Sequence, residues 1–278
     1  MIRTDVHVEK LGVNGVDLAY VEQGIGETVV FVHGAAGDWR SWEGLRPFVA
    51  EKCRFVSFSR RYHYPNVWAD DGRNYSVTQH VEDVAALIRA LDAGKVHLAG
   101  NSYGGRVAGY VALKYPDLLR SVILGEPSII APASAEGKAA LAAMQKDFAK
   151  SAAAAKAGDA KQSAILLYDA VIGEIGAFQQ ISPSRQQRWL DNANTMAPMH
   201  AGAGAIPVSC EQLGALKVPA LVIRGENTRN NFRYGNEAAL ECLPRHTESA
   251  VIANAPHPWP LVNPEAGAKA ILAFVAKH

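Results

Sequence analysis

The sequence predicts an α/β fold: a mostly parallel central sheet flanked by helices, with a helical cap inserted after the sixth strand. Short apolar runs alternate with amphipathic helical patterns, which is typical of a parallel sheet covered on both faces. This rhythm is interrupted by residues 131–211, which are rich in alanine and show helical patches without a strand pattern. We therefore divide the chain into a core domain, residues 1–130 and 212–278, and a cap (lid), residues 131–211.

The elements of the core follow from periodicity and turn signals. Two strands, residues 6–11 and 16–21, flank Asn14-Gly15, which reads as a hairpin turn. A continuous apolar run at residues 28–32 is typical of a strand buried on both faces. Further strands are expected at residues 54–58, 96–99, 121–124, 220–225 and 250–253. Helices are expected at residues 39–50, 77–93, 138–155, 162–172, 184–193 and 237–242, after Gly100 and after Asn263.

Composition limits the class of protein. The 278 residues are 49% hydrophobic and 20% charged, which is ordinary for a soluble globular protein with one large α/β domain. A net charge of +1 gives no electrostatic reason to expect nucleic acid or an anionic membrane as a partner. The first residues lack the apolar core of a signal peptide, and no run approaches membrane-spanning length, so we expect a cytoplasmic protein. Its oligomeric state stays open, with a homodimer as one option.

The three cysteines, Cys53, Cys210 and Cys242, are scattered along the chain and odd in number. Their spacing matches neither a metal site nor a disulfide framework. We therefore expect reduced, buried thiols and no metal site.

The stretch around Ser102 carries the strongest chemical signal. The apolar run 96–99 ends in Gly100-Asn101-Ser102-Tyr103-Gly104, and a helical pattern begins directly afterwards. This is a G-x-S-x-G match in the strand–turn–helix context that the motif requires. Such a turn holds the serine in a strained backbone conformation, and its glycines avoid collisions with neighbouring backbone. It also exposes the hydroxyl and directs the first helical N–H groups toward a developing oxyanion.

Together with this motif, His33-Gly34 after a buried strand and the late histidine of Ala255-Pro256-His257 make the chain similar to the α/β-hydrolase superfamily. The similarity is to the branch that carries a helical cap, which includes serine esterases and lactonases. A last helix beginning at Asn263-Pro264-Glu265 supports it. The resemblance implies the α/β-hydrolase fold and a Ser–His catalyst without metal or organic cofactor. It does not identify the substrate.

The resemblance also implies roles for individual residues. Ser102 would be the nucleophile, which needs a base within hydrogen-bond reach. His257 lies in the loop after the last strand, where the superfamily keeps that base. The oxyanion hole would combine the backbone N–H groups of Tyr103 and Ala35.

The acid of the triad departs from the family pattern. Relatives usually keep an aspartate shortly after the strand that follows the cap, but this chain has Thr228 at that place and no aspartate nearby. Glu126 ends the strand next after that of the nucleophile, and some haloalkane dehalogenases and zearalenone-type lactonases carry the acid there. We therefore expect Glu126 to orient His257, with Glu226 as the alternative.

Several further side chains are candidates for pocket walls. Relatives often have Asp-x-Arg-Gly-x-Gly where this chain has Ser59-Arg60-Arg61-Tyr62-His63-Tyr64, so its tyrosines would reshape that wall. Arg61 is expected to pair with a nearby acid rather than with substrate. Residues of the cap and one tryptophan after His257 are expected to contact substrate: Phe178, Trp189, Met196 and Trp259.

We predict a serine hydrolase that cleaves a carboxylic ester or lactone of a hydrophobic small molecule through an acyl-enzyme. The rival activity is that of a carbon–carbon bond hydrolase acting on ring-cleavage diketones, which resembles this scaffold and also uses serine and histidine. A rival of another class is a small-molecule receptor, because some receptors retain this fold and triad. A serine nucleophile argues against a dehalogenase or an epoxide hydrolase, which use aspartate at that place.

Overall fold

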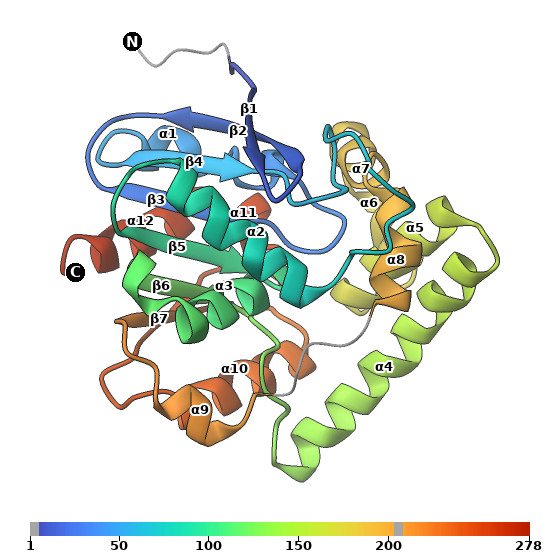
Figure 1. The fold of residues 1–278 in the computed structure, drawn as a ribbon. Coiled ribbons are helices and arrows are strands. Elements are labelled where there is room, and N and C mark those ends of the chain that lie inside the picture. The colour runs from blue at the N-terminus through green and yellow to red at the C-terminus, as the bar shows by residue number, and fades with distance from the viewer. Residues whose placement is uncertain (1–5, 203–207) are drawn as a thin grey trace.

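The computed structural model describes residues 6–202 and 208–278, and within them one eight-stranded sheet forms the centre of the molecule (Figure 1). The strands lie side by side in the order β1-β2-β4-β3-β5-β6-β7-β8. Pairing is antiparallel between β1 and β2 and between β2 and β4, and parallel between all other neighbours. The strands are β1 (Glu9–Val13), β2 (Val16–Gln23), β3 (Thr28–Val32), β4 (Arg54–Phe58), β5 (Val96–Asn101), β6 (Leu119–Gly125), β7 (Ala220–Gly225) and β8 (Glu248–Ile252). The predicted mostly parallel sheet is confirmed.

Helices cover both faces of the sheet (Figure 1). On one face lie α2 (Val77–Ala90), α3 (Tyr103–Lys114) and α10 (Asn230–Cys242). On the other face lie α1 (Arg46–Val49), α11 (Trp259–Val262) and α12 (Pro264–Val275). None of the described helices is both long and apolar enough to cross a membrane.

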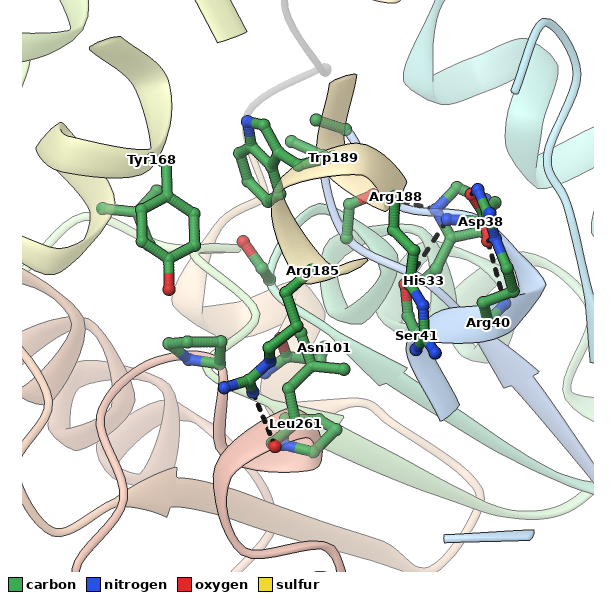
Figure 2. A pocket seen from close by; sticks show the side chains of 18 of the residues that line it. His33, Asp38, Arg40, Ser41, Asn101, Tyr168, Arg185, Arg188, Trp189 and Leu261 are labelled. Carbon is green, nitrogen blue, oxygen red and sulfur yellow. Dashed lines mark hydrogen bonds and ion pairs between the residues drawn. The ribbon is translucent and has the colours of Figure 1, made fainter. Parts of the chain in front are cut away.

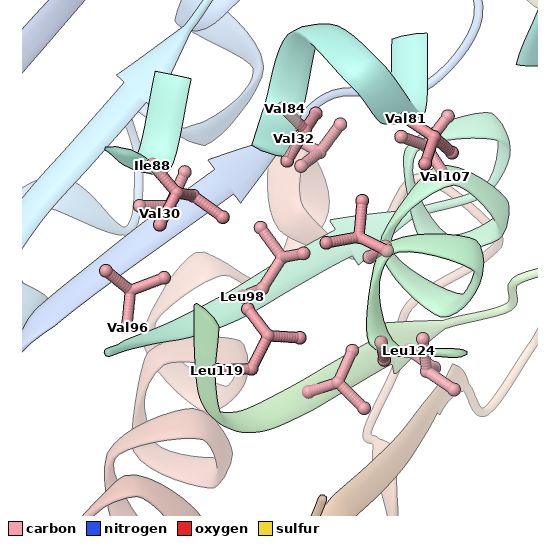
Figure 3. Packing of buried hydrophobic residues seen from close by; sticks show 14 of the residues in the cluster. Val30, Val32, Val81, Val84, Ile88, Val96, Leu98, Val107, Leu119 and Leu124 are labelled. Atoms are coloured by element: carbon pink, nitrogen blue, oxygen red, sulfur yellow. The ribbon is translucent and has the colours of Figure 1, made fainter. Parts of the chain in front are cut away.

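Buried strand β3 shows why the core has two halves. Val30 and Val32 point into the cluster under α2 and α3, whereas Val29 and Phe31 point into the cluster under α1 and α12. All four are fully buried, as expected for a strand with helices on both faces. Figure 3 shows the first cluster, in which Val84 of α2 packs near Val32. Each fully buried side chain of this size contributes about 1.5–3 kcal/mol.

Between β6 and β7 the chain leaves the sheet and forms a set of helices beside it (Figure 1). These helices are α4 (Ala135–Lys156), α5 (Ala160–Ile172), α6 (Ala177–Gln180), α7 (Pro183–Leu190), α8 (Met196–Ala201) and α9 (Cys210–Gly214). Helices α4, α5 and α7 fall where the sequence predicted helices. Residues 203–207, inside the predicted cap, lie outside the described residues. Helix α9 already packs on the core, because its Leu213 belongs to the cluster under α2 and α3.

The prediction of three reduced cysteines is wrong for two of them. Cys210 at the start of α9 and Cys242 at the end of α10 form a disulfide, whereas Cys53 is a buried free thiol. Burial raises the pKa of Cys53. The two bonded residues are 32 positions apart, and only the packing of α9 on α10 brings them together.

Candidate active site

The turn between β5 and α3 places Ser102 in a strained conformation. Its φ of 57° and ψ of −121° lie outside the regions that L-residues prefer. A β-carbon on Gly100 would collide with the carbonyl oxygen of Gly104, and one on Gly104 would collide with that of Val32. The N–H of Ser102 donates to Gly125 O at 2.7 Å, which ties the turn to the end of β6. The two glycines thus allow the tight bend that the motif predicted.

His257 and Glu126 meet beyond the carboxyl ends of the strands. The Nδ1 atom of His257 is hydrogen-bonded to Oε2 of Glu126, and both side chains are buried. Because the carboxylate can only accept, Nδ1 carries the proton. Nε2 is then free to accept a proton, and it has no partner among the described residues.

The carboxylate of Glu126 is held by two further donors. Thr228 Oγ1 donates to Oε2 at 2.7 Å, and Gly225 N donates to Oε1 at 2.7 Å. These bonds compensate the burial of the charge, since Glu126 is only 1% exposed. Thr228, at the place where an aspartate was expected from the resemblance, therefore contacts the carboxylate that bonds His257.

The alternative acid, Glu226, lies elsewhere. Its side chain is exposed, and its Oε2 accepts the N–H of Asn254 at 2.8 Å. No hydrogen bond joins it to His257 within the described residues. The geometry thus brings Glu126, and not Glu226, to the imidazole.

Phe232 of α10 fixes the plane of the imidazole from the side. Its ring stacks on that of His257 with centroids 3.6 Å apart and an angle of 17° between the planes. Sequence reasoning missed this residue, because the helix was expected to begin only at residue 237. The N-terminal part of α10 is polar apart from Phe232, so its apolar periodicity is weak.

The loop after β3 places Ala35 next to Ser102. Arg60 NH2 donates to Gly34 O at 3.0 Å, and Arg60 N donates to Nε2 of His33 at 2.9 Å. In a trans peptide the C=O and N–H groups point in opposite directions. Since the Gly34 carbonyl points to Arg60, the N–H of Ala35 points away from it. Tyr103, the other expected donor, is the first residue of α3, so its N–H has no partner within the helix.

Arg60 is an unusual support for this loop. Its side chain is 1% exposed, and within the described residues no carboxylate pairs with it. Its guanidinium lies 4.4 Å from the ring centroid of Tyr103, a cation–π contact. Arg61 instead pairs with Asp83 through two hydrogen bonds of 2.8 Å, as the sequence predicted.

Three buried histidines surround Arg60. Burial, with the nearby charge of Arg60 as the next cause, holds the pKa of His33, His63 and His80 well below the ordinary value. His33 and His63 each have hydrogen-bond partners, whereas neither ring nitrogen of His80 has one in the described part of the chain. Burial and the charge of Arg60 therefore disfavour the protonated form of these three histidines.

Two cavities have Ser102 in their lining. The small cavity, of about 100 Å³, is lined by Ser102, His257, Ala35, residues of the loop 33–42, residues of α5 and α7, and Pro258, Pro260 and Leu261. The large cavity, of about 520 Å³, is lined by Ser102, Ala35, Tyr103 and mostly apolar residues of α4, α5 and the segment 128–132. Ser102, Ala35 and Val171 line both. Figure 2 shows the small cavity, with Tyr168 and Trp189 above Arg185 in the view.

The predicted pocket residues separate into one that lines a cavity and three that do not. Trp189 lines the small cavity, and its Nε1 donates to Ala164 O at 2.7 Å. Phe178, Met196 and Trp259 line neither of these two cavities. Phe178 packs on Tyr168 of α5. Met196 is buried in a cluster with Ala155 of α4 and Leu167 of α5.

Trp259 and two tyrosines also lie outside the two cavities. Trp259 is fully buried against Trp42 in the core under α12. Tyr62 and Tyr64, expected to reshape a wall, line neither cavity. Tyr62 is buried and its hydroxyl donates to Asp70 at 2.7 Å, so it stabilises the loop after β4.

Comparison with curated proteins finds relatives that match part of the chain, two hydrolases among them. The chain is 30% identical over 114 residues to 2-(acetamidomethylene)succinate hydrolase of Mesorhizobium japonicum, across 41% of this chain and 40% of that protein. It is 28% identical over 120 residues to 2-hydroxy-6-oxo-2,4-heptadienoate hydrolase of Pseudomonas putida, across 40% of this chain and 41% of that protein. The matched stretches thus span well under half of each relative.

Comparison with solved structures extends over nearly the whole chain. A thermophilic esterase from Thermogutta terrifontis superposes with a TM-score of 0.76 and 23% identity, over 98% of both chains. The family model described as the alpha/beta hydrolase family matches residues 29–270. This match covers most of the chain and includes the turn of Ser102, the strand end of Glu126 and the loop of His257. The chain therefore belongs to the alpha/beta hydrolase family.

Proposed function

We propose that this hydrolase cleaves a carboxylic ester or lactone of a hydrophobic small molecule through an acyl-enzyme. Ser102 attacks the carbonyl carbon, and Nε2 of His257 takes the proton of its hydroxyl. The backbone N–H groups of Ala35 and Tyr103 stabilise the oxyanion. His257 then protonates the leaving alkoxide, and water activated by the same imidazole releases the acid.

One observation carries this proposal: the imidazole that faces the cavity of Ser102 is hydrogen-bonded from behind to the buried carboxylate of Glu126. That bond fixes the tautomer with Nε2 toward the cavity. It also stabilises the imidazolium that forms when the serine proton is transferred. A histidine held in this way, lining the same cavity as a serine on a strained turn, is suited to acyl transfer.

The test replaces the nucleophile. Ser102→Ala should reduce turnover of p-nitrophenyl esters by at least about 10⁴-fold, because the attacking oxygen is lost. A fluorophosphonate probe should label the wild-type protein at Ser102, as peptide mass spectrometry would show, and should leave the variant unlabelled. Its circular dichroism spectrum should match that of the wild type. Undiminished hydrolysis by a folded Ser102→Ala protein would refute the proposal.

The second candidate is a carbon–carbon bond hydrolase of ring-cleavage diketones. The observation that favours it is the similarity to 2-hydroxy-6-oxo-2,4-heptadienoate hydrolase. Parallel kcat/KM measurements on p-nitrophenyl esters, simple lactones and a vinylogous 1,5-diketone separate the two candidates. A diketone turned over at least about a hundred times better than every ester and lactone would transfer the proposal to this second reaction.

A further inference from the structure

Helix α7 presents two arginines to the small cavity. Arg185 and Arg188 are three residues apart and therefore lie on the same face of the helix. Arg185 NH2 donates to Leu261 O at 2.6 Å, close in sequence to His257 (Figure 2). The guanidinium of Arg188 has no hydrogen-bond partner within residues 6–202 and 208–278. Two cations thus face the cavity that contains the reactive serine.

The other charges on this cavity do not fully compensate them. Asp38 is the one carboxylate among its lining residues, and Arg40 already pairs with it through Nε at 2.9 Å and NH2 at 2.6 Å. The side-chain amide of Asn192 also donates to Asp38, at 2.8 Å. Both oxygens of Asp38 are therefore occupied. Arg40 also pairs with Asp191 at 2.8 Å, so Arg40, Arg185 and Arg188 together face two carboxylates and one positive charge remains in excess.

Such an excess is unfavourable unless an anion enters the cavity. Like charges one helical turn apart repel each other. The walls beside them are apolar, including Tyr168, Val171 and Trp189, and apolar walls strengthen electrostatic interactions by excluding water. Arginine side chains bind carboxylates with paired, charge-assisted hydrogen bonds. A carboxylate is thus the group that the small cavity fits best.

The large cavity also has one arginine in its lining, Arg106, whose Nε donates to Ser128 O at 3.0 Å, but most of its lining residues are apolar. Its lining includes Ile129, Leu141, Met144, Phe148 and Leu167. Such a surface favours an apolar group of substantial size, because each buried methylene contributes about 0.8 kcal/mol. Since Ser102 lines both cavities, a carbonyl at its hydroxyl is adjacent to both.

We infer that the substrate is an ester or lactone with two unlike halves, and this inference rests on the proposed function. One half carries a carboxylate that binds Arg185 and Arg188 in the small cavity. The other half is apolar and fills the large cavity. The scissile carbonyl lies between them at Ser102.

The test compares matched ester pairs that differ only in charge. In the first pair the carboxylate is in the acyl part: the mono-p-nitrophenyl ester of glutaric acid against p-nitrophenyl methyl glutarate. In the second it is in the leaving group: 4-(hexanoyloxy)benzoate against its methyl ester. We expect kcat/KM to favour the anionic member of at least one pair by about tenfold or more, as a charge-assisted contact would. High salt should reduce this preference.

The variants assign the preference to the two arginines. Arg185→Gln with Arg188→Gln should abolish the preference, so that the anionic and the neutral member of each pair are hydrolysed with equal kcat/KM. Arg120→Gln, a surface substitution on β6, is the matched control and should keep the preference. Equal rates on both members of both pairs in the wild type would overturn the inference. A preference that survives the double substitution would overturn it as well.

Failure of the proposed function would give a different result. If no ester is hydrolysed and Ser102 is not labelled by the fluorophosphonate, the reaction is wrong, and binding alone then tests the cavity. Calorimetric titration of the Ser102→Ala protein with 4-hydroxybenzoate, and with 4-hydroxybenzamide as its neutral match, measures this directly. Binding of the acid alone, lost on replacing both arginines, supports the anion site. Equal binding of acid and amide, or no binding of the acid, overturns it.

Discussion

Glu126 follows directly on β6, yet its carboxylate reaches the loop beyond β7. It accepts the N–H of Gly225 and the hydroxyl of Thr228, and its Oε2 also bonds His257. Because β6 and β7 are neighbours in the sheet, a longer side chain from one strand end can occupy the place that a shorter acid would take from the other. A carboxylate from the end of either strand could therefore reach the same position beside the imidazole.

Replacing Glu126 by Gln should lower kcat on p-nitrophenyl esters by about 10²–10⁴-fold. The amide keeps the shape of the side chain but loses the charge that stabilises the imidazolium. It also presents an NH₂ group that can reverse the tautomer of His257. Steady-state kinetics at a single pH, with the melting temperature as a check on folding, measure the effect.

Two comparison variants locate the acid. Glu226→Gln removes an exposed carboxylate and should change kcat by less than about twofold; a loss confined to this variant would transfer the role to Glu226. Adding Thr228→Asp to Glu126→Gln places a carboxylate beside the vacated position of the Glu126 charge. That double variant should regain part of the lost rate.

At the scale of elements, the start of α2 and the loops after β3 and β4 meet around Arg60. His33 and His63 belong to those loops, and His80 lies in the first turns of α2. Their rings contact one another, with centroids 4.6 Å apart for His33 and His63 and 6.4 Å apart for His63 and His80. Since Arg60 lies among them without a carboxylate, protonation of any of these rings would add a second buried charge.

This cluster should make stability depend on pH in weak acid. The folded-state pKa of all three histidines is lowered, so above about pH 6.5 neither state binds their protons and stability is constant. As the pH falls below that value, the unfolded chain binds protons that the folded chain does not. The free energy of unfolding should then fall by about 1.4 kcal/mol per pH unit for each histidine.

His80→Leu should remove one such proton, because neither nitrogen of His80 has a partner to lose. Urea unfolding between pH 6 and pH 5 should show a slope smaller by about 1.4 kcal/mol per pH unit than in the wild type. Between pH 7 and pH 8 the slopes of the two proteins should coincide. An unchanged slope in weak acid would show that His80 is protonated equally in both states.

The elements differ in how far the sequence determines them. Strand β3 was predicted with its correct ends, because a strand buried on both faces is a continuous apolar run between polar residues. Helix α10 begins at Asn230, seven residues before the predicted start, since its first turns contact the site through Phe232 and carry polar residues elsewhere. Ser76 caps α2 by accepting the N–H of Gln79, whereas the side chain of Gln79 bonds Asp83.

At the scale of the whole molecule, the disulfide joins helix α9, which follows the other helices between β6 and β7, to helix α10, which covers the sheet. It closes a stretch of 32 residues between Cys210 and Cys242. Replacing both by Ser should lower the free energy of unfolding by about 3–4 kcal/mol, since the unfolded chain gains conformations. The melting temperature should fall by about 5–8 °C for a chain of this size.

Calorimetry or circular dichroism with and without a reducing agent checks this prediction. The reducing agent should lower the melting temperature of the wild type toward that of the double variant. It should not lower that of the variant further. Equal melting temperatures in all four samples would show that the bond contributes nothing to stability.

The contacts between distant segments were the part that the sequence could not supply. Cysteine spacing along the chain does not report that α9 packs on α10. Trp259 and Met196 have the apolar character of pocket residues, but whether such a side chain faces a cavity or the core depends on how the cap sits on the sheet. The turn of Ser102 and the position of His257 were predictable, because each depends on a local motif beside a strand.

Because the two cavities share lining residues, the steps of the proposed reaction should follow a fixed order. Ser102, Ala35 and Val171 belong to both cavities, so an acylated serine keeps one chamber filled while the other empties. Water for the second half-reaction must therefore arrive through the chamber that the alcohol has just vacated. A dead-end inhibitor shaped like that alcohol would slow deacylation, whereas a mimic of the acid would compete only with the incoming ester.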